Sequence, residues 1–264
     1  MPKSFTGNAL KDVYKDILHT INSNSGLSTT IKQITCGDGD GTSLYLSNRN
    51  AKVQPSADTT TNTVIYDADG NALVTVDSTN DLVKAGIGQH TVNTQYAHFG
   101  VGSGNSVWAG SSANTHYAVP FNSIQTQALV SGGTSTDPAT SFTITSTADD
   151  MVGVLWYLCD NITIDRVVWF AGGDAASSDT LRAHLMSYTI DVGGSASGGD
   201  LSSGAVLAYS SDVSNLGYEQ SYYNQMTIST ADVNAGKAIM FFFRADSTVN
   251  SDYTINATVK YHLR

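Results

Sequence analysis

Residues 253–263, YTINATVKYHL, alternate between apolar and polar side chains over their whole length. Every second residue belongs to the apolar set, which consists of Tyr253, Ile255, Ala257, Val259, Tyr261 and Leu263. Successive side chains of a strand point to opposite faces, so a period of two predicts a β-strand with one buried face. This stretch therefore predicts a long strand that covers a hydrophobic core.

Further strand-like segments precede this stretch at close intervals. They are residues 117–121, 141–146, 152–159, 162–170, 181–191, 205–210, 224–229 and 237–245. Residues 152–159, VGVLWYLC, are almost entirely apolar, which favours a centrally buried strand. About nine strands without a helical period between them predict an antiparallel β-sandwich, and a jelly roll fits that number. We assign residues 116–264 to this head domain.

A period of two also runs through the region before the head, which predicts β-hairpins. The alternating segments are residues 29–35, 42–47, 62–67 and 72–77, joined by CGDGDG at 36–41 and DADGN at 67–71. Each joint resembles the start of a calcium loop. However, positions six and twelve counted from Asp38 are Ser43 and Arg49 rather than Gly and Glu, and counting from Asp67 fails in the same way. We interpret both joints as turns, and no metal is expected.

Residues 85–120 mix Gly and Ser with aromatic side chains such as Tyr96, Phe99 and Trp108. A flexible linker carries few aromatics, and a compact domain carries less Gly and Ser. The segment is interpreted as an extended connector whose aromatics pack on a neighbour, for which another copy of the chain is a candidate. Residues 27–115 then form a β-hairpin stem with this connector.

The N-terminal region, residues 1–26, carries the pattern of an amphipathic helix over residues 8–22. The apolar positions step by three and four and comprise Leu10, Val13, Tyr14, Ile17, Leu18 and Ile21. An isolated helix of this length is marginal in water, so its stripe must be covered. We expect it to dock on a particle or to bundle with its symmetry mates.

Composition excludes several classes of function. The chain has 264 residues and a net charge of −10, which argues against binding to nucleic acid or to an anionic membrane. Its two cysteines cannot form a disulfide framework or a four-thiolate zinc site. The N-terminus has no apolar signal segment and no run is long enough for a membrane span, so synthesis in a cytoplasm is expected.

No catalytic motif is found, and we predict that the protein is not an enzyme and needs no cofactor. The sequence contains no Gly-x-Ser-x-Gly elbow, phosphate-binding glycine loop or His-Glu-x-x-His motif. The adjacent acids Asp149 and Asp150 are interpreted as a turn. A histidine from each of three chains meeting on an axis remains an open alternative.

The aromatic residues fall into two groups. Trp156, Tyr157, Trp169 and Phe170 lie in apolar segments and are assigned to the core. By contrast, Tyr218, Tyr222 and Tyr223 lie in the polar segment NLGYEQSYYNQ. Aromatic faces beside Asn, Gln and Glu are suited to stacking on sugar rings, so these three are candidate glycan-binding residues. A strand edge or a subunit contact is the alternative interpretation.

Several segments resemble known proteins. Residues 22–53 and 76–100 resemble the opening and the stem of structural proteins of tailed bacteriophages, marine ones in particular, while TLRAHLMSYTID at 180–191 and residues 234–263 are similar to the terminal domain of phage fibre-like proteins. The resemblance implies a homotrimeric fibre or spike in the virion. Its N-terminus would attach to other virion proteins (capsid, portal or tail), and its jelly-roll-like head would be able to bind host-surface glycan.

Two other functions fit the same sequence. One is a capsid decoration or vertex protein, a head fibre, that stabilises the shell. The other is a carbohydrate-binding module or a glycan-degrading enzyme. An export signal would favour the module, and a cleft with two opposed acids would favour the enzyme.

Overall fold

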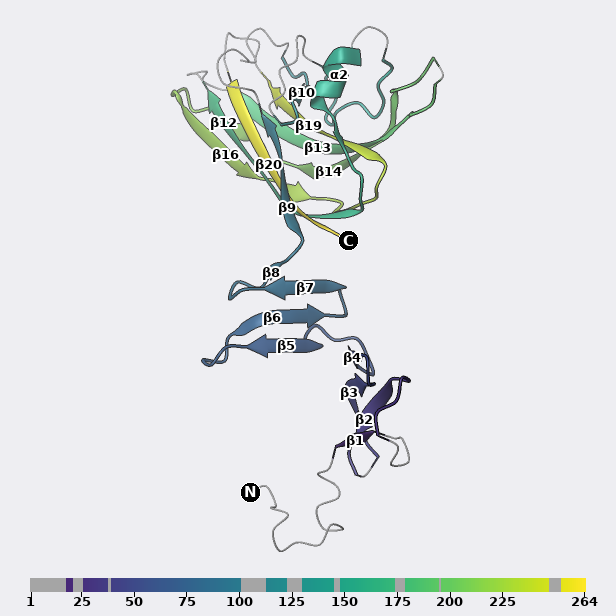
Figure 1. Ribbon diagram of the computed structural model, residues 1–264. Coiled ribbons are helices and arrows are strands. Elements are labelled where there is room, and N and C mark those ends of the chain that lie inside the picture. The colour runs from purple at the N-terminus through teal and green to yellow at the C-terminus, as the bar shows by residue number, and fades with distance from the viewer. Residues whose placement is uncertain are drawn as a thin grey trace, which may run out of the picture. The chain divides into compact units, whose positions relative to one another are not determined.

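The computed structural model describes residues 18–20, 26–37, 39–100, 113–122, 130–144, 148–173, 179–194, 196–246 and 253–264. The protein is mainly β, as predicted, with four antiparallel sheets (Figure 1). The chain divides into two compact units, Met1–Val92 and Asn93–Arg264.

The first sheet of the N-terminal unit has the order β1-β2-β3-β4. Its strands are β1 (His19–Thr20), β2 (Lys32–Thr35), β3 (Gly41–Leu46) and β4 (Ala51–Val53). The turn predicted between β2 and β3 is confirmed: the amide of Cys36 donates to the carbonyl of Asp40 at 2.9 Å. Gly39 has a φ of +91°, which a residue with a side chain rarely adopts. Asp38 lies outside the described residues.

The second sheet of this unit has the order β5-β6-β7-β8. Its strands are β5 (Thr63–Tyr66), β6 (Ala72–Asp77), β7 (Leu82–Ala85) and β8 (His90–Thr91). The predicted DADGN turn joins β5 to β6. One carboxylate oxygen of Asp67 accepts from the amides of Asn71, at 2.7 Å, and Asp69, at 3.0 Å. Hydrogen bonds from Asn71 lower the pKa of Asp67, so the ionised side chain stabilises the turn.

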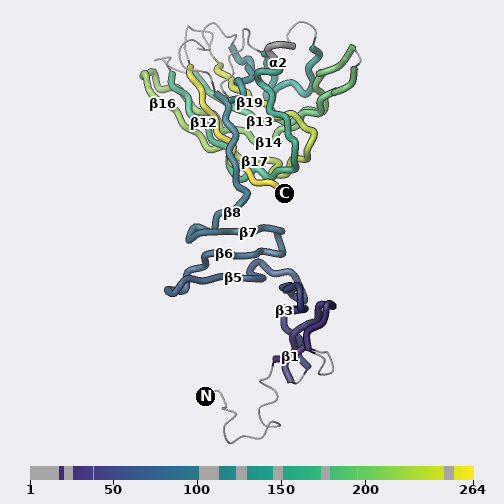
Figure 2. Tube along the Cα trace, in the orientation of Figure 1, coloured from purple at the N-terminus to yellow at the C-terminus, as the bar shows by residue number. Residues whose placement is uncertain are grey.

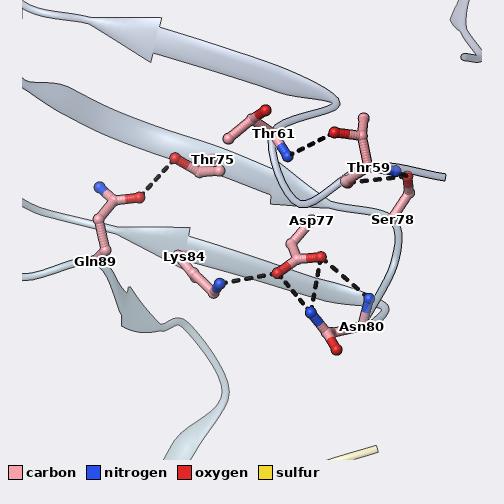
Figure 3. A network of polar contacts seen from close by, with 8 residues as sticks. All are labelled: Thr59, Thr61, Thr75, Asp77, Ser78, Asn80, Lys84 and Gln89. Carbon is pink, nitrogen blue, oxygen red and sulfur yellow. Dashed lines mark hydrogen bonds and ion pairs between the residues drawn. The ribbon is translucent and has the colours of Figure 1, made fainter.

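One face of the second sheet carries a polar network (Figure 3). The hydroxyl of Thr75, which is buried, donates to Gln89 Oε1 at 2.6 Å. Two carboxylate oxygens of Asp77 accept from the side-chain amide of Asn80, and one of them also accepts from Lys84. Polar side chains thus satisfy one another on this face.

The smaller sheet of the C-terminal unit has the order β16-β12-β20-β9, and β18 (Asp232–Val233) pairs with β12. The other strands are β16 (Gln220–Gln225), β12 (Ile162–Gly173), β20 (Tyr253–Leu263) and β9 (Thr94–Gly100). The strand predicted at residues 253–263 is therefore confirmed, and it lies between β12 and β9 (Figure 1).

The larger sheet has the order β10-β19-β13-β14-β17, and its long strands lie behind the smaller sheet in Figure 2. Its strands are β10 (Tyr117–Val119), β19 (Lys237–Ala245), β13 (Thr180–Ile190), β14 (Leu201–Tyr209) and β17 (Thr227–Ile228), with β11 (Trp156–Tyr157) paired to β19 and β15 (Val213–Ser214) paired to β13. All pairings are antiparallel.

A single hydrophobic core joins the two sheets of the C-terminal unit. It contains Trp169 and Val259 from the smaller sheet and Leu185 and Phe243 from the larger one, all fully buried. The rings of Trp169 and Phe243 meet edge to face with centroids 5.6 Å apart. Two antiparallel sheets that share one core form a β-sandwich-like unit.

The prediction of a strand at residues 152–159 is wrong for its first part. A short helix, α2 (Ala148–Val154), takes its place, and the strand β11 is only two residues long. Met151 and Val154 are buried, three residues apart, while Val152 is exposed, which is a helical period. The turn predicted at Asp149 and Asp150 is also wrong, because both residues belong to the first turn of α2.

Three further predictions differ from the structure. The strand predicted at residues 141–146 is not formed over the described residues 141–144, where Phe142 makes an isolated bridge to Leu201. Residues 94–100, assigned to the connector, form β9 of the C-terminal unit, and the ring of Phe99 packs on Phe241 within that unit. The helix predicted over residues 8–22 falls mostly outside the described residues. His19 and Thr20, which belong to it, form β1 instead and pair with β2, because hydrogen bonding to a neighbouring strand replaces a helical turn there.

Candidate functional site

Strand β16 separates two of the tyrosines that were predicted to bind glycan. Tyr222 is buried in the core, whereas its neighbour Tyr223 is 48% exposed on the other face of the sheet. Consecutive side chains of a strand point to opposite faces, so these two cannot share one surface. Tyr218 precedes β16 and is exposed. Of Tyr222 and Tyr223, only Tyr223 is therefore accessible to a ligand.

Tyr222 belongs instead to a buried hydrogen-bond network. Its hydroxyl donates to Asn215 Oδ1 at 2.7 Å, and Asn215 Nδ2 donates to the hydroxyl of Tyr253 at 3.0 Å. The hydroxyl of Tyr253 donates to Asp179 Oδ2 at 2.5 Å. All four residues are buried, and desolvation raises the pKa of Tyr253. The glycan-binding prediction for Tyr222 is corrected to a structural role.

Tyr223 shares its surface with two other aromatic residues. Phe170 on β12 is its direct partner in the strand register, and the ring centroids lie 4.9 Å apart. Tyr96 on β9 is 59% exposed and lies on the same side of the sheet. The assignment of Phe170 to the core was wrong, because the alternation of β12 turns Trp169 inward and Phe170 outward. The assignment of Tyr157 was wrong for the same reason, since β11 buries Trp156 and leaves Tyr157 exposed.

Two cations lie between these aromatic residues. Arg166 on β12 is exposed, and Lys260 on β20 is its direct register partner. Lys260 is in turn the register partner of Tyr96. The guanidinium of Arg166 donates to the hydroxyl of Tyr223 at 3.2 Å. We call the surface formed by Tyr96, Arg166, Phe170, Tyr223 and Lys260 the aromatic face.

A β-bulge shapes the aromatic face. The register between β12 and β20 shifts between Ile164 and Arg166, which leaves Asp165 as an extra residue. Both Asp165 and Arg166 are consequently exposed although they are neighbours. Asp165 Oδ1 lies 2.9 Å from Nδ1 of His262, which is therefore the partner of this carboxylate.

The aromatic face surrounds an open hollow of about 490 Å³. The hollow is lined by Tyr96, Asp165, Arg166, Val168, Phe170, Tyr223, Thr258 and Lys260. Aromatic rings provide flat apolar surfaces, the hydroxyl and carboxylate provide hydrogen bonds, and the two cations attract negative charge. Together these groups can bind a polar ligand with flat apolar faces.

A second open hollow, of about 520 Å³, lies on the larger sheet. Its lining includes Asp137, Arg182, His184 and Asp212. Arg182 and Asp212 form a two-pronged ion pair with distances of 2.5 and 2.7 Å, which raises the pKa of Arg182 and lowers that of Asp212. The charges of Arg182 and Asp212 therefore neutralise each other in this hollow.

A pair of buried histidines adjoins the second hollow. The rings of His116 and His184 meet edge to face, with centroids 5.0 Å apart. Burial lowers the pKa of both, and for His184 to about 4. His184 Nε2 lies 3.3 Å from Asp137 Oδ1. Both rings are thus neutral near pH 7, which fits a packed structural pair.

The second sheet of the N-terminal unit has an apolar face opposite its polar network. Strand register places Ile65, Val74, Val76, Val83 and Ala85 on it, and we call these residues the stem face. Ile65 is 55% exposed and Val83 39%. Ile34 is the only hydrophobic residue of the described N-terminal unit that is buried. No second layer covers the stem face within the described part of this unit.

The predicted docking stripe is described at one position. Leu10, Val13, Tyr14, Ile17 and Ile21 lie outside the described residues, and Leu18 is exposed. No helix in the described ranges is long and apolar enough to cross a membrane. Among the same residues, no group of three or more His, Cys, Asp or Glu side chains could hold a metal ion.

Comparisons with known proteins give no relatives. No protein-family model matches the chain, and neither a curated protein nor a solved structure matches it.

Proposed function

We propose that this chain is a structural protein of a bacteriophage virion that forms a homotrimeric fibre or spike. The observation that carries the proposal is the uncovered stem face. The proposal also uses the resemblance of residues 22–53 and 76–100 to phage stem segments. In this arrangement residues 1–26 attach to the particle, and the C-terminal unit is a jelly-roll-like head.

The stem face needs a partner for a simple energetic reason. A fully buried Val or Ile side chain contributes about 1.5–3 kcal/mol, and the stem face has four of them. A small sheet that leaves such residues in water gains little from folding by itself. Further copies of the same chain, related by rotation about an axis, can cover each face with its equivalent. The occupant that we assign to the stem face is therefore another copy of this chain.

The head contributes a binding surface. The aromatic face has the combination of ring faces and hydrogen-bonding groups that suits a sugar. We assign it to host-surface glycan, and Tyr223 is the residue common to this surface and to the sequence-based prediction. The same surface also favours the alternative of a carbohydrate-binding module, which would bind glycan without self-association.

Light scattering on the purified protein tests the self-association. The expected mass is about three times the chain mass of 27.9 kDa. A monomer at micromolar concentration would exclude a trimeric fibre and leave the module as the better explanation.

Labelling of intact particles tests where the protein is attached to the virion. Antibody-gold against the head should mark projections from the tail or the capsid. Marking of the whole capsid surface would favour the decoration protein. Deletion of residues 1–26 should remove the protein from particles while the head remains folded.

A further inference from the structure

Two positive side chains face each other on the aromatic face. Arg166 and Lys260 are direct register partners on neighbouring antiparallel strands, and both border the same hollow. Like charges in this position destabilise a sheet because the side chains are close together. A bound anionic group would offset this repulsion.

No carboxylate of the described residues forms an ion pair with either cation. Among the described residues, the ion pairs of Lys and Arg are Lys84 with Asp77, Arg182 with Asp212, and Arg264 with Asp232. None of them involves Arg166 or Lys260. Asp165 is near in sequence, but its carboxylate is oriented to His262. Two cations therefore remain without a carboxylate partner in a chain whose net charge is −10.

The geometry points to an acidic polysaccharide as the ligand of the aromatic face, and this inference rests on the proposed glycan-binding function of the head. The acidic group, a carboxylate or a sulfate, lies between Arg166 and Lys260. Sugar rings lie on Phe170 and Tyr223 on one side of the cations and on Tyr96 on the other. Arginine binds the oxygens of a carboxylate or a sulfate through paired hydrogen bonds, and its bond to Tyr223 holds the guanidinium at the edge of the hollow.

The small number of cations on the aromatic face favours a sparsely charged polysaccharide over a nucleic acid as the ligand. Aromatic rings and cations also form the binding surfaces for single strands, but those surfaces follow a continuous row of phosphates. The hollow at the aromatic face is lined by two cations, the acid Asp165 and the hydroxyl of Thr258. Such a set matches a chain that has many hydroxyls and few negative charges. The strongly negative chain would also repel a ligand with one charge per nucleotide.

The experiment measures binding of the full-length protein to four immobilised polymers. They are hyaluronan, with a carboxylate on every second sugar, κ-carrageenan, with a sulfate on every second sugar, neutral dextran, and oligothymidylate. Binding to at least one acidic polysaccharide should be at least about tenfold tighter than binding to dextran, which corresponds to one charge-assisted contact. Comparison of hyaluronan with κ-carrageenan identifies the acidic group.

Variants locate the site. Arg166→Gln and Lys260→Gln should each weaken binding to the acidic polymer by about tenfold, and Phe170→Ser should do so as well. The matched controls are Lys237→Gln and Tyr157→Ser, which replace a lysine and a half-exposed aromatic residue on the other sheet and should bind like the wild type. Circular dichroism and the melting temperature establish that each variant is folded.

Several outcomes overturn the inference. It fails if dextran binds as tightly as the acidic polysaccharides, or if neither acidic polysaccharide binds. It also fails if oligothymidylate binds more tightly than both, or if Arg166→Gln and Lys260→Gln leave the affinity unchanged. If dextran binds as well as the acidic polymers and Phe170→Ser abolishes binding, glycan binding by the head stands and only the acidic class fails. Light scattering measures trimer formation separately. Failure of the proposed trimer can therefore be distinguished from failure of acidic-polysaccharide binding.

Discussion

Asp77 and Lys84 form an ion pair diagonally across β6 and β7, with 2.9 Å between Asp77 Oδ2 and Lys84 Nζ. Their direct register partners are Leu82 and Thr75, so the pair links two rungs that share one face, with the Val76–Val83 rung between them. Hydrogen bonds from Asn80 and the charge of Lys84 lower the pKa of Asp77 from 3.8 to about 2. The ionised carboxylate therefore stabilises the polar side of a sheet whose other side is the stem face.

Replacement of Asp77 by Asn should lower the melting temperature of the N-terminal unit. A lowered pKa in the fold means that the carboxylate stabilises above its ordinary pKa of 3.8 and that this effect is lost as the pH falls to about 2. Thermal unfolding followed by circular dichroism should give a clear difference between wild type and Asp77→Asn at pH 7, but not at pH 2. Asp69→Asn, in the exposed DADGN turn, is the control. An equal difference at both pH values would contradict the electrostatic explanation.

A charge on the stem face should disrupt self-association. We expect Val83→Lys to reduce the mass in light scattering from about three chains toward one, because the lysine would be buried between copies. Leu73→Lys is a matched control, since Leu73 is 40% exposed, Val83 is 39% exposed, and β6 places Leu73 on the polar side of the same sheet. If only Leu73→Lys lost association, the interface would lie on the polar side of the sheet and the proposal for the stem face would be wrong.

Removal of the Tyr222 hydroxyl should destabilise the head without affecting ligand binding. Tyr222→Phe removes one of two donors to Asn215 Oδ1, the other being the amide of Gly217, so the expected cost is about 0.5–1.5 kcal/mol in the free energy of unfolding. Urea unfolding followed by tryptophan fluorescence measures this change. Tyr223→Phe, at the neighbouring exposed position, should be within about 0.5 kcal/mol of the wild type. If the Tyr222 variant lost glycan binding while it kept its stability, the structural role would be wrong.

Acid should destabilise the head through its buried histidines. His184 has a pKa lowered from 6.5 to about 4, so the unfolded chain takes up a proton before the folded one does. Stability is therefore fully present above pH 6.5 and is lost as the pH falls toward 4. The groups that face His184 are His116, Asp137, Arg182 and Arg244, and desolvation outweighs the opposing effect of Asp137.

The melting temperature between pH 7 and pH 4 measures the effect. His184→Gln should flatten the decline, while His98→Gln, on the exposed side of β9, should keep it. A decline of the same size in both variants would show that other groups cause the acid sensitivity.

Local pattern predicted many of the strands and the turns. The alternation of residues 253–263 predicted β20, because the period of two depends on neighbours within one strand, and apolar strand-like segments predicted β12, β13 and β19. The Asp and Gly residues of DADGN predicted its turn for the same reason, since Asp67 bonds to amides two and four residues away. The same period could have shown that Tyr222 and Tyr223 point to opposite faces.

The binding surface depends on contacts that no local pattern contains. Residues 152–159 gave no period, so helix and strand could not be distinguished there. Phe170 lies in an equally apolar run, and which of its neighbours turns inward is decided by packing against the other sheet. Tyr96, Arg166 and Lys260 meet because β20 pairs with β9 and β12, which are far from it in the chain. Sequence thus determined the strands, whereas the register between distant strands, fixed by burial of a common core, decided which side chains form the aromatic face.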